Sequence, residues 1–126
     1  MIYLVDEHGK SVNDVCFKDY VQAEDFLINI RKRGISNWYL DYGKLNKKSV
    51  LPYKFIVIEF MEKDYSLYSM AIKAKHYPTP SELLGWLKKD MEIMGYDNIF
   101  GYYETDIDDV YAGYDTENIT NWPICE

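Results

Sequence analysis

The chain has 126 residues, of which 48% are hydrophobic, and its formal net charge is −7. This length suits a single domain, and the hydrophobic share excludes a disordered chain. The negative charge argues against sequence-independent binding of nucleic acid, which depends on neutralising phosphates. No segment approaches the roughly 20 apolar residues of a membrane span, and residues 1–7 do not resemble a signal peptide, so we expect a cytoplasmic protein.

The beginning of the chain predicts two strands and a helix. Apolar and β-branched residues at 2–5 and 12–17 predict strands that pair across a turn. A helix is predicted at 19–33, beginning at the capping residue Asp19 and ending before Gly34. Its apolar residues recur at helical spacing, so we expect one face of this helix to be buried.

The middle of the chain predicts a β-meander. Residues 38–42, 53–61 and 66–75 are rich in β-branched and aromatic residues, and polar turns separate the three segments. Each segment is short enough to be a strand, and consecutive strands joined by turns usually pair in antiparallel fashion.

A second helix is predicted from Thr79, the N-cap of a capping box with Pro80 as the first helical residue and Glu82 as the partner of the cap. Gly95 is predicted to end this helix. Gly85 inside it lowers helix propensity by about 1 kcal/mol, and we interpret this glycine as a close approach to the sheet. The predicted buried stripe consists of Leu83, Leu84, Leu87, Met91 and Met94.

Residues 99–105 predict a last strand, and residues 106–112 predict a short helix that ends at Gly113. Together the elements predict one α+β domain over residues 1–126, with an antiparallel β-sheet of about four to six strands and both helices packed on one face. The element order is β-(β)-α-β-β-β-α-β. If one strand is left out, this order matches the split βαβ pattern of ferredoxin-like folds.

Charge is distributed unevenly along the chain. Residues 1–89 contain all 14 lysines and arginines and 11 of the 21 acidic residues, a net charge of +3. Residues 90–126 contain ten acidic residues and no basic one, a net charge of −10. Aromatic residues are interleaved with these acids, and a tail that only aids solubility would be poor in aromatics. The acidic, aromatic-rich C-terminal segment from about residue 90 is therefore expected to be a binding surface, with a solvated acidic face as the alternative.

The sequence contains no motif for catalysis, metal binding or phosphate binding. The only imidazole bases are His8 and His76, and neither stands in a catalytic pattern. Cys16 and Cys125 show no spacing of the zinc-site kind, and the acidic run at 106–109 fails the calcium-loop pattern at most positions. We therefore expect no enzyme activity, no cofactor and no metal.

These features favour a non-enzymatic, acidic protein-binding inhibitor that blocks a basic, nucleic-acid-acting protein partner. Two settings share this physics: a phage or mobile-element anti-defence protein such as an anti-CRISPR, and an immunity protein against a toxin nuclease. Carboxylates can occupy the sites that otherwise hold phosphates, and aromatic anchors add affinity. The predicted contact residues are Tyr103, Glu104, Asp106, Asp108, Asp109, Tyr111, Tyr114 and Asp115.

Two other hypotheses remain. In the first, the chain is a small homo-oligomeric accessory or structural protein, and its aromatic residues form the contact between two copies, for example in a homodimer. Alternatively, it is an enzyme with an unfamiliar site that uses Asp108 or His76, in which case a cleft should converge on one of these residues. Neither hypothesis involves direct binding to nucleic acid or to a membrane.

Overall fold

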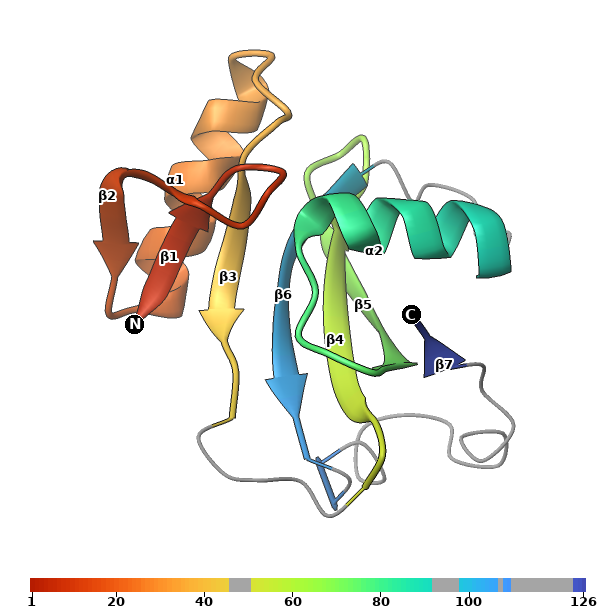
Figure 1. Ribbon diagram of the computed structural model, residues 1–126. Coiled ribbons are helices and arrows are strands. Elements are labelled where there is room, and N and C mark those ends of the chain that lie inside the picture. Colours follow the sequence, from red (N-terminus) through yellow and green to blue (C-terminus); the bar gives the residue numbers. More distant parts are fainter. Residues whose placement is uncertain (46–50, 92–97, 107, 110–123) are drawn as a thin grey trace.

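A computed structural model of the protein describes residues 1–45, 51–91, 98–106, 108–109 and 124–126, and the description below concerns these residues (Figure 1). The elements in chain order are β1 (Ile2–Val5), β2 (Ser11–Phe17), α1 (Tyr20–Lys32), β3 (Tyr39–Gly43), β4 (Lys54–Met61), β5 (Leu67–Ala74), α2 (Pro80–Trp86), the π-helical turn η1 (Leu87–Met91), β6 (Ile99–Thr105) and β7 (Ile124–Cys125). No helix in this part of the chain is long and apolar enough to cross a membrane.

The described strands form one mixed sheet of seven strands in the order β2-β1-β3-β6-β4-β5-β7. β6 lies between β3 and β4, parallel to β3 and antiparallel to β4. β7 pairs parallel with β5, and the remaining neighbours are antiparallel. An α+β domain is confirmed. The expectation of an antiparallel sheet of about four to six strands is wrong, because the sheet has seven strands and two parallel pairs. The ferredoxin-like order is wrong as well, because β6 separates β3 from β4.

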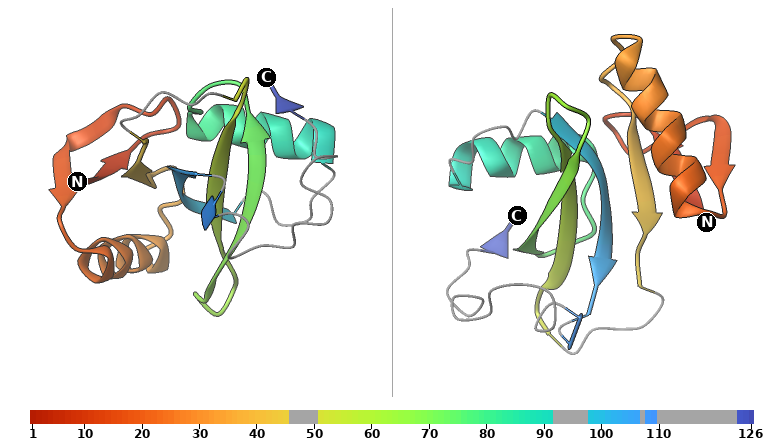
Figure 2. Two further views of the ribbon diagram at one scale, coloured as in Figure 1. Left: turned by 90° about the horizontal axis from the view of Figure 1, so that it is seen from below. Right: turned by 180° about the vertical axis from the view of Figure 1, so that it is seen from behind.

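The two helices lie on opposite faces of the sheet, α1 over β1–β3 and α2 over the β4–β6 region (Figures 1 and 2). Alternate residues of β3 show the two faces: Leu40 and Tyr42 belong to the core beside α1, whereas Tyr39 belongs to the core beside α2. The prediction that both helices pack on one face is therefore wrong. Both faces of the central strands are apolar, and each face needs its own cover.

α1 begins and ends as the sequence predicts. The Asp19 carboxylate accepts a hydrogen bond from the backbone N–H of Val21. Beyond the C-cap, Gly34 has a φ of +87°, and the N–H groups of Gly34 and Ile35 donate to the carbonyls of Arg31 and Ile30. This pair of hydrogen bonds is the Schellman ending, which favours glycine because the backbone is left-handed.

α2 begins with the predicted capping box. The Thr79 hydroxyl accepts from the N–H of Glu82, and the Glu82 carboxylate accepts from the N–H of Thr79. Gly85, however, is exposed, and a Cβ built there would meet nothing within 4 Å, so its interpretation as a close approach to the sheet is wrong. The predicted end at Gly95 and the stripe residue Met94 lie outside the described residues.

A buried arginine joins α1 to the sheet. Arg31 is 8% exposed, and its guanidinium donates to the carbonyl oxygens of Trp38 and Ile99, both at 2.8 Å. The guanidinium carbon also lies over the rings of Tyr39 and Phe100, at 5.6 and 5.8 Å. Carbonyl oxygens and ring faces thus solvate this cation, and they tie the end of α1 to the start of β6 and to Trp38 and Tyr39 at the start of β3.

Candidate partner-binding surface

The predicted contact residues begin on β6 and continue beyond its C-terminal end. Tyr103 and Glu104 belong to β6, and Asp106, Asp108 and Asp109 follow the strand. The other three predicted residues, Tyr111, Tyr114 and Asp115, lie outside the described residues, as does most of the predicted helix at 106–112.

Glu104 is bound inside the protein. Its side chain is 3% exposed, and its carboxylate accepts from the backbone N–H of Leu45 at 3.1 Å and pairs with Lys54 Nζ at 3.5 Å. These contacts connect β6 to the first residue of β4 and to the segment after β3. Because the Glu104 carboxylate is buried with two internal partners, an outside cation would have to displace Lys54 to reach it.

Tyr103 is half-buried on the face that α1 covers. Its ring meets the ring of Tyr42 edge to face, with centroids 6.1 Å apart. Edge-to-face pairs of this kind contribute to the core. Tyr103 therefore offers a partner only part of its ring.

The aspartates after β6 form a short, exposed acidic turn. The Asp106 carboxylate accepts from the backbone N–H of Asp109 at 3.0 Å, the usual contact of a helix N-cap. Asp108 and Asp109 have helical backbone and are exposed, whereas Asp106 is half-exposed. The Asp106 cap holds the N–H of Asp109, and the side chains of Asp108 and Asp109 are exposed to solvent. We call Asp106, Asp108 and Asp109 the acidic turn.

Neither histidine stands in a catalytic arrangement among the described residues. His76 Nε2 lies 2.5 Å from Glu82 Oε2, and the imidazole meets the Trp86 indole edge to face. His8 is exposed beside Glu7, at 3.4 Å. No hydroxyl or thiol is hydrogen-bonded to either ring in this part of the chain, and no group of three or more metal-ligating side chains occurs there.

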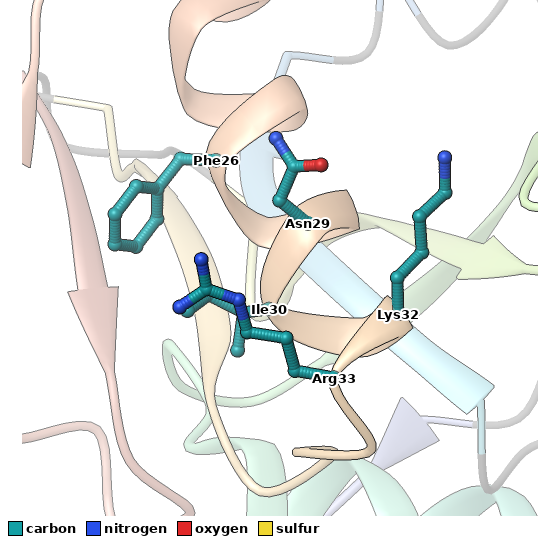
Figure 3. A pocket seen from close by; sticks show the side chains of 5 residues that line it. All are labelled: Phe26, Asn29, Ile30, Lys32 and Arg33. Carbon is teal, nitrogen blue, oxygen red and sulfur yellow. The ribbon is translucent and has the colours of Figure 1, made fainter.

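A groove that the sequence did not reveal lies along α1 (Figure 3). It encloses about 380 Å³ and is lined by Phe26, Asn29, Ile30, Lys32 and Arg33. Arg33 folds back so that its guanidinium lies beside Ile30, and Lys32 points away from it (Figure 3). Lys32 Nζ lies over the ring of Tyr65, 5.1 Å from the ring centroid. The apolar floor is formed by Phe26 and Ile30, and the cation that lies against it is Arg33. A cation there suits an anionic group, so the chemistry of the groove is opposite to that of the acidic turn. In the sequence, the basic residues of the last turn of α1 are the feature that could have predicted this groove.

Searches against protein-family models, curated proteins and solved structures find no match to this chain. The candidate surface therefore rests on its own geometry and charge.

Proposed function

We propose that the protein is a non-enzymatic binding protein that uses the acidic turn to occupy a basic surface of a nucleic-acid-acting protein. The observation that supports the proposal is the exposed pair Asp108 and Asp109, on a turn that Asp106 caps. The cap holds the backbone at Asp109, and a group that is held in place before binding loses less conformational entropy on binding.

The charge distribution supports the same choice of partner. The acidic turn belongs to a 37-residue segment with a net charge of −10, so no basic side chain of that segment competes for the carboxylates. Such a segment attracts a basic protein over several ångströms and accelerates association, and this attraction weakens as salt is added. An inhibitor of a nuclease, whether anti-defence or immunity protein, is the function that this chemistry fits best.

In the proposed function, Glu104 has a different role from the partner contact that the sequence predicts. Because it is paired with Lys54 inside the protein, we propose that it holds the base of the acidic turn and does not itself bind the partner. The contact residues of the proposal within the described part of the chain are Asp106, Asp108, Asp109 and the exposed part of Tyr103.

The test begins with capture of partners by the immobilised protein from a lysate of its source cells, at low and at moderate salt. We expect one basic, nucleic-acid-acting protein, retained less well at higher salt. Its affinity is then measured by calorimetry for the triple variant Asp106→Asn, Asp108→Asn, Asp109→Asn, in which asparagine keeps the helix cap. A loss of about 30-fold or more in affinity is expected, the size typical of interface anchors.

A matched control separates position from total charge. The triple variant Glu7→Gln, Asp14→Asn, Asp25→Asn removes the same number of charges from exposed sites elsewhere, and it should bind nearly as well as the unchanged protein. Equal losses in both triples would reduce the effect to net charge and would contradict a specific acidic turn. Capture of nothing except the protein itself, with a dimer in sedimentation, would favour the homo-oligomeric accessory protein.

A further inference from the structure

The groove along α1 is lined mainly by one stripe of the helix. Residues of this stripe recur at intervals of three and four, so they lie on one side of α1: Phe26, Asn29, Ile30 and Arg33. Phe26 and Ile30 are half-buried, whereas Asn29 and Arg33 are exposed. The groove therefore offers an apolar contact, a carboxamide and a guanidinium to one ligand (Figure 3).

Arg33 is the cation of this groove, and it belongs to none of the ion pairs between the residues that the structure describes. The neighbouring Lys32, by contrast, lies over the ring of Tyr65. A guanidinium can bind a carboxylate through two parallel hydrogen bonds, and an exposed guanidinium keeps these donors for a ligand. The groove therefore fits a ligand in which a carboxylate stands next to an apolar group.

The size of the groove limits what can bind there. Its volume of about 380 Å³ is at the lower end of the range of ligand pockets, roughly 300–1,000 Å³. None of its lining residues is fully buried, so the groove is open to solvent. A few side chains of a larger molecule can therefore enter it.

The acidic turn has the chemistry that this groove accepts. In the sequence, Asp106 and Asp108 flank Ile107, so an aliphatic residue stands between two carboxylates. The side chains of Asp108 and Asp109 are exposed in the structure. The carboxylates match the guanidinium of Arg33, and the isoleucine matches the apolar floor. One chain thus has two surfaces that complement each other in charge and in apolar character.

The acidic turn cannot reach the groove of its own chain. Arg31, in the same half of α1 as the groove, donates a hydrogen bond to the carbonyl of Ile99, the first residue of β6. The acidic turn instead follows Thr105, the last residue of this seven-residue strand. Such a strand is roughly 20 Å long. The two surfaces therefore lie toward opposite ends of β6 (Figure 1), and only a second molecule can bring them together.

We propose that the groove of α1 binds the acidic turn of a second copy of this chain, so that the copies associate head to tail. Each copy then uses its groove for one neighbour and its acidic turn for another. Contacts between two different surfaces extend into rings or filaments and do not stop at a symmetric dimer. This contact needs no other protein, so it does not depend on the proposed function. A basic partner bound to the acidic turn would compete with it.

The net charge of −7 on each copy opposes this association. The repulsion acts between whole molecules, whereas Arg33 and the carboxylates would meet at hydrogen-bond distance. At physiological ionic strength, charges separated by more than about 8 Å are largely screened. We therefore expect the association at this ionic strength, and at high protein concentration because the contact area is small.

Sedimentation and NMR of the purified protein test the proposal without any partner. As the protein concentration increases, the average mass should rise above that of the monomer and then beyond that of a dimer. In amide NMR spectra, the signals of residues 26–33 and of 108–109 should shift with the same dependence on concentration. A symmetric dimer formed through the aromatic residues would not select these two sets of signals.

Two variants separate the two surfaces. Arg33→Gln removes the cation of the groove, and the double variant Asp108→Asn, Asp109→Asn removes the exposed carboxylates; all three positions are exposed, so the fold should persist. Each variant should weaken self-association by about tenfold or more, the loss that follows when an interface anchor is removed. Lys18→Gln, at an exposed position before the other end of α1, is the matched control and should associate like the unchanged protein.

A mixture of the two variants completes the test. Arg33→Gln keeps its acidic turn and the double aspartate variant keeps its groove, so one copy of each should form a dimer that does not grow. The proposal is overturned if the mixture associates no better than each variant alone. It is also overturned if the unchanged protein stays monomeric at every concentration, which would leave the groove to an acidic segment of another protein. Neither result would affect capture of a basic partner, because that capture does not use the groove.

Discussion

At the scale of single residues, Gly101 constrains the centre of the sheet. A Cβ at this position would lie 2.5 Å from Cε2 of Tyr42 and 2.9 Å from the carbonyl oxygen of Leu40. The second of these is a backbone atom of the paired strand, so it cannot move without opening the β3–β6 pairing. The glycine is required by close packing, and its φ lies in the ordinary range.

We therefore predict that Gly101→Ala lowers the free energy of unfolding by about 2–3 kcal/mol, the range that overpacking reaches in well-packed cores. Urea denaturation measures this value. Gly85→Ala is the matched control: its Cβ would meet nothing within 4 Å, and alanine favours a helix, so stability should rise by about 0.5–1 kcal/mol. Equal effects at the two glycines would contradict the close approach of Tyr42 to β6.

The two glycines also show what a sequence can reveal about packing. Gly85 interrupts a helical pattern and so attracts notice, yet its surroundings are open. Gly101 lies in a strand, where the sequence gives no sign that a tyrosine some 60 residues earlier will cross it. Contact between distant residues depends on the strand order, and local patterns do not contain that order.

At the scale of elements, the sequence predicts local structure well. The bounds of β1 and β6 agree with the predicted ranges, and β2, β4 and β5 differ by one residue at some ends. The caps of both helices are confirmed, since they depend on side chains within three residues of one another. By contrast, β6 lies between β3 and β4, in the centre of the sheet, where both faces of a strand are buried. In the sequence, the nearly continuous apolar runs at 55–58 and 99–103 indicate strands of this central kind.

The capping box of α2 gives a prediction at this scale. Thr79→Ala should lower the free energy of unfolding by about 1 kcal/mol, because the N–H of Glu82 loses its acceptor. Thr79→Ser keeps the hydroxyl and should stay within about 0.5 kcal/mol of the unchanged protein. Thermal unfolding followed by circular dichroism measures both. A loss in the serine variant as large as in the alanine variant would indicate that the methyl group of Thr79, which lies near Gly9, matters more than the cap.

At the scale of the whole molecule, the acidic excess of the C-terminal segment does not form one uniform surface among the described residues. Glu104 is buried beside Lys54, Glu126 pairs with Lys75, and the acidic turn faces solvent. Sequence alone cannot separate these cases, because strand position decides which carboxylate meets a lysine. Fewer residues of the candidate surface therefore face solvent than the sequence predicts.

The last residues of the chain close one edge of the sheet, so they connect parts that are distant in sequence. Cys125 is 1% exposed, and its carbonyl accepts from the N–H of Lys75 at 3.1 Å. The Trp86 indole donates to the backbone carbonyl of Glu126, which ties α2 to β7. β7 thereby covers the end of β5 and completes the core beside α2.

Removal of residues 124–126 should therefore destabilise the whole domain, by on the order of 2 kcal/mol, since the end of β5 and part of Trp86 become exposed. Guanidinium denaturation followed by tryptophan fluorescence measures the loss. The matched control is Glu126→Gln, which removes only an exposed ion pair with Lys75 and should cost about 0.5 kcal/mol or less. If the shortened chain were as stable as the full one, the contacts of β7 with β5 and Trp86 would contribute nothing to the fold, and the sheet would effectively end at β5.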